Sequence, residues 1–274
     1  MMYPHQRFIS HQVSFMTHYL LFIIYFHPDM YVRQYSYIYS LNFIINMKKI
    51  IIPFFCAVLF SVPAAAQKKG AASAKTEAVK SNQTPKEIVD NYFKALGGKD
   101  KLDAVKSTIT DNTVAVQGME IQMTTKKLGN KFKSVQSFMG KEMVQLFDGE
   151  KGYFDQMGTK SDIPADKIAE LKKGKPIDAL AFDASNFQTA STEKLDGKDY
   201  NVLSSDKGKF YFDAATGLLY KTDAGEGKAT IKSYMAVDGI QFPAEVDAEG
   251  GGQKMTIKTT KVVINSGVTD ADFK

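Results

Sequence analysis

The sequence predicts a mainly β (α+β) fold: one large curved antiparallel sheet with an N-terminal helix and a helical flap. Three observations predict it. One strongly amphipathic helical pattern covers residues 84–96. After it, apolar and polar residues alternate through most of residues 114–265, which is the period of strands with one buried face. Short turns that contain glycine join these segments, and such short connections force consecutive strands to run antiparallel.

The composition changes along the chain and excludes several kinds of chemistry. All four His and both Arg lie before Met47, and from Gln67 onward there is no His, Arg, Cys or Trp. The domain therefore cannot hold a Ser-His-Asp triad, a thiol nucleophile or a Cys/His zinc site. The 31 Lys and 29 Asp and Glu of this stretch leave a net charge of +2, which argues against nucleic-acid binding. We predict a protein that is not an enzyme and has no catalytic residue, metal or cofactor.

Residues 47–66 have the three parts of a signal peptide in the right order. Two lysines after Met47 form the positive n-region, residues 50–62 form the apolar h-region, and a run of three alanines ends at Ala66. We expect cleavage between Ala66 and Gln67. The mature protein is then expected in the periplasm or outside the cell.

Two other interpretations of this segment are weaker. Residues 50–66 are only 17 residues long and include two prolines, so they are at the short limit for a transmembrane helix. Cys56 lies in the middle of the apolar run, whereas a lipoprotein signal needs its cysteine at the end. Residues 1–46 lack capping and turn signals. We expect them to be untranslated sequence upstream of a true start at Met47, with a disordered extension as the alternative.

The remaining chain divides into a linker and one domain. Residues 67–83 contain mainly Ala, Lys and Ser with little apolar bulk, which is typical of a flexible linker. Residues 84–274 are enough for one domain with a substantial core. No cysteine follows Gln67, so this core must be stable without disulfides.

The domain begins with the best-marked helix of the sequence. Thr84, Pro85 and Glu87 provide an N-cap, a proline at the first helical position and a side chain that can reach back to the cap. Apolar residues then follow at helical spacing on one face: Ile88, Val89, Tyr92, Phe93 and Leu96. Gly97-Gly98 is expected to end the helix in a left-handed turn.

Strands and turns make up most of the domain after this helix, and we expect eleven to twelve strands. The first group of strand segments is Val114–Val116, Met119–Met123, Lys131–Met139, Met143–Phe147 and a short strand from Tyr153. The helical flap interrupts them over Pro164–Phe187 and begins with a short helix at Pro164–Lys173. The second group is Thr192–Leu195, Tyr200–Ser204, Lys209–Asp213, Leu218–Asp223, Thr230–Ala236, Ile240–Asp247 and Met255–Asn265.

Soft apolar side chains are concentrated in the first group of strands. Nine residues are expected to line an apolar cavity between the curved sheet and the helix and flap: Val114, Val116, Met119, Ile121, Met123, Phe132, Phe138, Met143 and Phe147. Methionine adapts to ligands of varied shape, so this lining would suit acyl chains. The same pattern is also that of an ordinary core, and the sequence alone does not separate the two.

Four segments, in this order, resemble a known family: Phe93–Leu102, Leu146–Tyr153, Phe210–Leu218 and Asp238–Pro243. Over roughly residues 84–274 the chain resembles the outer-membrane lipoprotein-sorting (LolA/LolB-like) superfamily. It looks most like the branch of Bacteroidetes-type secreted proteins, which includes a domain appended to some insulinase-type zinc proteases. The resemblance implies an incomplete β-barrel, closed by helices, whose apolar cavity can hold lipid acyl chains.

Two functions from different classes fit the sequence. The first is non-enzymatic binding of lipid or lipoprotein acyl chains in the periplasm or envelope. The alternative is a non-catalytic interaction or accessory module of the cell envelope, similar to the domain appended to insulinase-type proteases. In that case the apolar face is simply core, and an envelope protein binds elsewhere on the molecule.

Overall fold

The structure is a computed structural model, and it describes residues 79–225 and 227–274. The predicted upstream sequence 1–46 and signal peptide 47–66, with its cleavage site between Ala66 and Gln67, lie outside the described residues. So does the predicted linker up to residue 78. Within the described ranges, no helix is long and apolar enough to cross a membrane.

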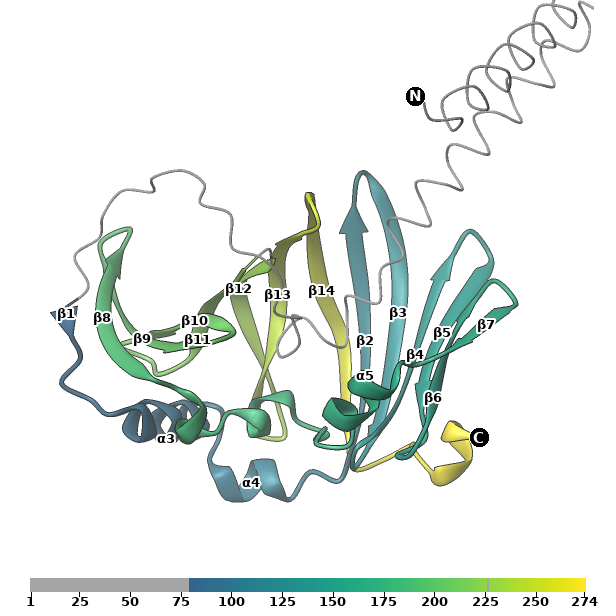
Figure 1. Cartoon of the computed structure of the whole chain (residues 1–274), viewed down its shortest axis with the longest axis horizontal. Coiled ribbons are helices and arrows are strands. Elements are labelled where there is room, and N and C mark those ends of the chain that lie inside the picture. Colours follow the sequence, from purple (N-terminus) through teal and green to yellow (C-terminus); the bar gives the residue numbers. More distant parts are fainter. Residues whose placement is uncertain (1–78, 226) are drawn as a thin grey trace, which may run out of the picture. The chain divides into compact units, whose positions relative to one another are not determined.

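One sheet of fourteen strands dominates the described chain (Figure 1). Every neighbouring pair of strands is antiparallel, so the predicted large antiparallel sheet is confirmed. The strands are β1 (Val79–Lys80), β2 (Ser107–Val116), β3 (Met119–Leu128), β4 (Lys131–Phe138), β5 (Lys141–Phe147), β6 (Gly152–Gln156), β7 (Thr159–Asp162), β8 (Thr189–Leu195), β9 (Lys198–Ser205), β10 (Gly208–Asp213), β11 (Leu219–Ala224), β12 (Gly227–Val237), β13 (Ile240–Gly250) and β14 (Gln253–Ile264).

Two meanders meet in the middle of this sheet. Strands β2 to β7 pair in sequence order, strands β8 to β14 do the same, and β14 pairs with β2 to join the two groups. Bulges shift the register between β12 and β13 and between β14 and β2; a bulge bends its strand and increases the local twist. The sheet is open, because β1 and β7 form its two edges.

Helix α3 (Pro85–Ala95) begins as the sequence predicts. Thr84 and Glu87 form a complete capping box: the Glu87 backbone N–H donates to Thr84 Oγ1 at 3.3 Å, and the Thr84 backbone N–H donates to Glu87 Oε2 at 2.7 Å. Each bond satisfies a backbone donor that the first turn of a helix leaves without an intrahelical partner. The hydrogen bonds from Thr84 also lower the pKa of the Glu87 carboxyl.

Loss of this cap is expected to weaken the domain measurably. Thr84→Ala should lower the free energy of unfolding by about 1 kcal/mol, because the capping oxygen is removed. Thr84→Ser keeps the oxygen and should lose less than half of that. Urea unfolding followed by circular dichroism measures both values, and equal losses for the two variants would contradict the capping role.

The C-terminal end of α3 is fixed by two glycines and by the sheet. The N–H of Gly98 donates to the carbonyl of Phe93 at 2.9 Å, and the N–H of Gly97 donates to that of Lys94 at 3.1 Å, which is the Schellman pattern. The carbonyl of Leu96 accepts a hydrogen bond from the backbone N–H of Gln241 in β13 at 2.9 Å. The end of the helix is therefore attached to the beginning of β13.

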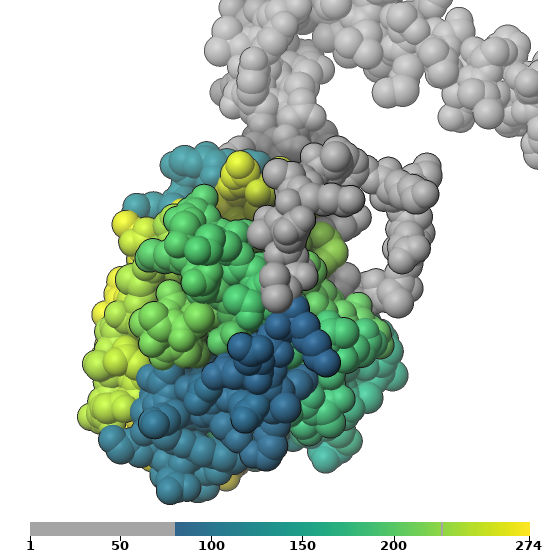
Figure 2. Space-filling view, turned by 90° about the vertical axis from the view of Figure 1, so that its left-hand side faces the viewer, coloured from purple at the N-terminus to yellow at the C-terminus, as the bar shows by residue number. Residues whose placement is uncertain are grey.

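The main core lies between α3 and the half of the sheet that β9 to β13 form. Its buried members are Ile88, Val89, Tyr92, Phe93, Leu96, Leu102, Val105, Ile177, Phe182, Leu203, Phe210, Phe212, Leu219 and Ile240. Figure 2 shows the blue residues of α3 and α4 (Lys99–Asp103) packed against the green and yellow-green residues of later elements. We call the face of the sheet that carries this core the inner face, and the opposite face the outer face.

The helical excursion between β7 and β8 contains α5 (Ala165–Leu171) and two 3₁₀ helices, η2 (Asp178–Ala181) and η3 (Ala184–Asn186). Its two halves pack differently. α5 has no buried residue, as expected for a flap. Phe182, however, is 5% exposed, and its ring lies 5.4 Å from the rings of both Tyr92 and Phe210. The second half is therefore part of the main core, whereas the sequence predicted a flap over the whole segment.

The chain ends on the outer face in a short 3₁₀ helix, η4 (Asp270–Phe273). Phe273 is 4% exposed, and two ion pairs flank it: Lys131–Asp270 at 2.6 Å and Lys126–Asp272 at 2.5 Å. A hydrogen bond from each lysine lowers the pKa of its partner carboxyl. These contacts attach the C-terminal residues to β3 and β4.

Candidate apolar binding face

Cross-strand register brings all nine predicted lining residues to the inner face. Thr108 in β2 lies directly opposite Ile264 in β14, which packs against the main core. Directly opposite residues share a face, and faces alternate along each strand. Following the opposite residue pairs from Thr108 across β3, β4 and β5 identifies which residues of each strand lie on the inner face. It includes Val114, Val116, Met119, Ile121, Met123, Phe132, Phe138, Met143 and Phe147.

The nine side chains differ in exposure. Six are buried: Val114, Val116, Met123, Phe132, Met143 and Phe147. Three are half-buried: Met119, Ile121 and Phe138. The apolar alternation in the sequence thus identified residues that lie together on one surface. Their role in lining a cavity stays a prediction.

A row of polar residues divides this surface, and the sequence analysis missed it. Thr110, Thr125, Ser134 and Gln145 lie directly opposite one another across β2 to β5, on the inner face. Thr125 and Ser134 are buried, and the Thr125 hydroxyl donates to Ser134 Oγ at 3.2 Å. The signal was present as polar residues in the same alternation as the apolar ones. The inner face is therefore not continuously apolar: a polar row lies between Phe132 and Phe147 on one side and Met123 and Met143 on the other.

The excursion crosses the inner face at one end of this surface. Asp178 of η2 forms an ion pair with Lys127 of β3, and the Thr108 hydroxyl donates to the carbonyl of Pro176 at 3.5 Å. Lys127 and Thr108 are directly opposite each other. Val116 lies eight residues further along β2, a distance of roughly 26 Å at the rise of a strand. These contacts of the excursion are therefore far from the Val116 end of the face.

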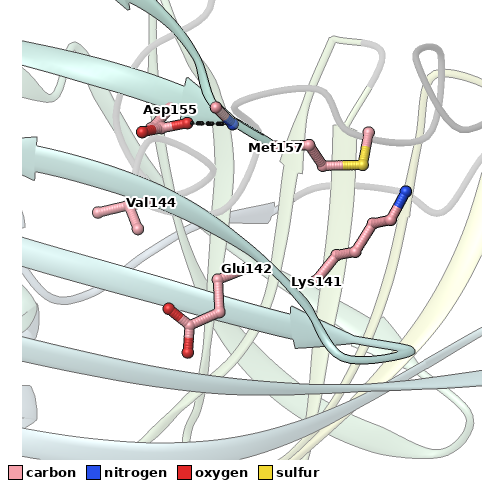
Figure 3. A pocket seen from close by; sticks show the side chains of 6 residues that line it. Lys141, Glu142, Val144, Asp155 and Met157 are labelled. Carbon is pink, nitrogen blue, oxygen red and sulfur yellow. Dashed lines mark hydrogen bonds between the residues drawn. The ribbon is translucent and has the colours of Figure 1, made fainter.

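None of the nine residues lines either of two surface pockets found in the described part of the chain. The first has a volume of about 410 Å³ and is lined by Lys141, Glu142, Val144, Asp155, Met157 and Gly158 (Figure 3). There Asp155 Oδ1 accepts a hydrogen bond from the backbone N–H of Gly158 at 2.8 Å, which stabilises the turn between β6 and β7.

The second pocket has a volume of about 350 Å³ and lies beside the stacked rings of Tyr200 and Tyr220, whose centroids are 4.7 Å apart. The carboxylate in its lining, Asp213, accepts hydrogen bonds from the backbone N–H groups of Ala215 and Thr216. These hydrogen bonds stabilise the turn that follows β10.

The two tyrosine side chains Tyr92 and Tyr234, in and beside the main core, have structural roles. Tyr234 donates its hydroxyl hydrogen to the carbonyl of Leu219 at 2.6 Å, and its phenol interacts electrostatically with that of Tyr92. Burial raises the pKa of both phenols, so both are neutral at physiological pH. Within residues 79–225 and 227–274, no three His, Cys, Asp or Glu side chains are placed to hold a metal ion.

Comparison with known proteins gives likenesses of structure only. No protein-family model matches the chain, and no curated protein matches it. A DUF1329 family protein from Desulfovibrio piger is similar, with 14% identity and a TM-score of 0.47, over 70% of this chain and 98% of that one. A putative outer membrane lipoprotein-sorting protein domain from Vibrio parahaemolyticus has 13% identity and a TM-score of 0.49, over 69% of this chain and 97% of that one.

A LolA superfamily protein from Nitrosomonas europaea is also similar, with 9% identity and a TM-score of 0.46, over 70% of this chain and 98% of that one. Two of these three similar structures are named for lipoprotein sorting or for the LolA superfamily. The Bacteroidetes-type branch is named by none of these three.

Proposed function

We propose that this protein is a non-enzymatic component of the cell envelope that binds lipid or lipoprotein acyl chains on the inner face of its sheet. One observation carries the proposal: nine apolar residues predicted from the sequence lie on one face of an open sheet. The proposal includes export, with cleavage between Ala66 and Gln67 and a mature protein in the periplasm or outside the cell. The mature chain would then begin at Gln67; the predicted linker 67–83 is shortened at its end, because β1 (Val79–Lys80) already belongs to the sheet of the domain.

The chemistry of the face fits an acyl chain better than a polar ligand. Each methylene that leaves water contributes about 0.8 kcal/mol, so even half of a long acyl chain supplies substantial affinity without a specific contact. Three of the nine residues are methionines, whose unbranched side chains accommodate ligands of different shape. Met119, Ile121 and Phe138 are half-buried and leave part of the surface accessible to a ligand.

A matched pair of variants tests this proposal. Ile121 and Val144 are both half-buried, the first on the inner face and the second on the outer face. Ile121→Gln is expected to weaken binding of a long-chain fluorescent fatty acid about tenfold, since the buried contact of such a side chain is worth about 1.5–3 kcal/mol. Val144→Gln should leave binding unchanged. Fluorescence titration measures both dissociation constants.

The outcomes are distinct. Absence of fatty-acid binding, or equal losses in both variants, would sink the proposal. Native mass spectrometry of protein purified from the envelope supplies a second readout, because lipid of discrete mass should remain bound to the chain. The same spectrum gives the start of the protein: a mass beginning at Gln67 is expected, and a species that retains Tyr3 contradicts both the predicted start and the cleavage.

The alternative is a non-catalytic accessory module whose partner is an envelope protein. One observation favours it: six of the nine residues are already buried, as they would be in an ordinary core. This function expects no lipid in the native mass spectrum. It also expects one dominant protein cross-linked to the chain in the envelope, with the same yield for Ile121→Gln as for the unchanged protein.

A further inference from the structure

The two sides of the sheet end differently: a short additional strand pairs with β8 on one side, whereas β7 is the last strand on the other (Figure 1). The β8 edge is extended by β1, which pairs Val79 with Thr192 and Lys80 with Ser191. The β7 edge has no further strand within the described residues, and all four residues of β7 are exposed. An open edge presents unpaired backbone donors and acceptors that can pair with another chain.

The hairpin geometry shows which backbone groups of β7 point outward. β6 and β7 are joined by the two-residue turn Met157-Gly158, and Phe154 lies opposite Ser161. In an antiparallel pair, hydrogen-bonded and non-bonded residue pairs alternate, and the pair that closes a two-residue turn is bonded. Ser161 is therefore bonded to β6, in agreement with the next bonded position, where the N–H of Ile163 donates to the carbonyl of Gly152 at 3.0 Å. The N–H and C=O groups of Lys160 and Asp162 point away from β6.

These outward groups limit how a second copy of the same strand can pair. When two copies of β7 pair antiparallel, the residues that exchange backbone hydrogen bonds must be Lys160 or Asp162 in each copy. Three registers meet this condition: Lys160 opposite Lys160, Asp162 opposite Asp162, and Lys160 opposite Asp162. Two of them place Lys160 opposite Lys160 or Asp162 opposite Asp162, and like charges directly opposite are destabilising. The third is centred on Ser161 and places each Lys160 opposite the other copy's Asp162. Only this register satisfies the hydrogen bonds with opposite charges.

We propose that β7 is an interface between two copies of this chain, paired antiparallel about a two-fold axis at Ser161. Each Lys160 exchanges backbone hydrogen bonds with Asp162 of the second copy, and their side chains form ion pairs on the outer face. Ser161 meets its counterpart on the inner face. The interface is isologous, as a two-fold dimer requires. It joins the sheets of the two copies into one continuous sheet, with both inner faces on the same side.

The dimer is expected to be weak. Four residues per copy bury much less than the roughly 1,200–2,000 Å² of a stable interface, so association should depend on concentration. Charged residues on a short edge strand are also a common protection against pairing. The two roles differ in one respect: protection requires no particular arrangement of charges, whereas the dimer requires Lys160 and Asp162 to have opposite signs.

Cysteine cross-linking tests the register. In the full chain with Cys56→Ser, which removes the only native cysteine, Ser161→Cys places two thiols directly opposite at a non-bonded pair, within disulfide reach. Thr159→Cys is the matched control. In the proposed register its two thiols lie four residues apart, roughly 14 Å along the strands. Under mild oxidation, Ser161→Cys should form covalent dimer at least ten times faster than Thr159→Cys; equal rates would overturn the proposal.

Charge reversal tests the pairing without cysteine. Sedimentation over a concentration series should show that Lys160→Glu weakens dimerisation at least tenfold. The double variant Lys160→Glu with Asp162→Lys should restore it, because opposite charges again face each other. Lys254→Glu, an exposed outer-face change on β14, is the control and should have no effect. A protein that stays monomeric at every concentration, or a double variant that fails to recover while its circular dichroism is unchanged, refutes the interface.

Discussion

Phe182→Ala is expected to lower the free energy of unfolding by about 3–5 kcal/mol, the usual cost of removing a buried phenylalanine. Phe182 is 5% exposed, and its ring contacts Tyr92 of α3 as well as Phe210 and Phe212 of β10. The variant leaves a cavity where helix, sheet and excursion meet. Urea unfolding followed by circular dichroism measures the loss.

Ile168→Ala provides the comparison within the same excursion. Ile168 lies on α5, which has no buried residue, so this change should cost less than about 1 kcal/mol. Losses of similar size in the two variants would show that the whole excursion packs as one unit. A large difference would show that the core holds the Phe182 half much more strongly than the α5 half, so that α5 can move without exposing core.

Gly97→Ala is the second change with a large expected effect. Gly97 has φ of +123°, and a Cβ at this position would lie 2.3 Å from the backbone oxygen of Gly239. The backbone conformation costs a side chain about 1–2 kcal/mol, and the overlap adds about 1–3 kcal/mol. The helix end cannot move away easily, because the carbonyl of Leu96 is bonded to Gln241. We therefore expect a loss of about 2–5 kcal/mol in urea unfolding.

Gly118→Ala separates the two causes. Gly118 has φ of +77°, and a Cβ there meets nothing within 4 Å. This variant should lose only the conformational part, about 1–2 kcal/mol. If Gly97→Ala cost no more than Gly118→Ala, the close approach of α3 to the turn before β13 would not constrain the fold.

Local signals in the sequence predicted local structure well. The capping box at Thr84 and the two glycines after Leu96 predicted both ends of α3, because helix termini depend on adjacent backbone groups. Alternation predicted the inner-face residues of β2 to β5, because side chains point to opposite faces of a strand in turn. These features need no information from distant parts of the chain.

Strands without an apolar alternation, and packing between distant residues, were not predicted. β7 consists of Thr, Lys, Ser and Asp, which lack the apolar alternation of a buried strand, and β1 is only two residues long. The packing of Phe182 against Tyr92 could not be read from the irregular spacing of apolar residues after Pro176. For the candidate face, alternation identified the apolar members, but the pairing of Thr125 with Ser134 depends on the register between β3 and β4, which the sequence analysis did not assign.

The pairing of β14 with β2 has a consequence for how the protein is made. The two strands that join the meanders come from opposite ends of the domain: Val116 lies opposite Met255, and Thr108 opposite Ile264. Each meander can begin to form from neighbouring hairpins, but the strands that unite them can pair only after β14 (Gln253–Ile264) has been synthesised. Contacts this distant in sequence close slowly. The growing polypeptide therefore stays without its finished tertiary structure until β14 has been synthesised.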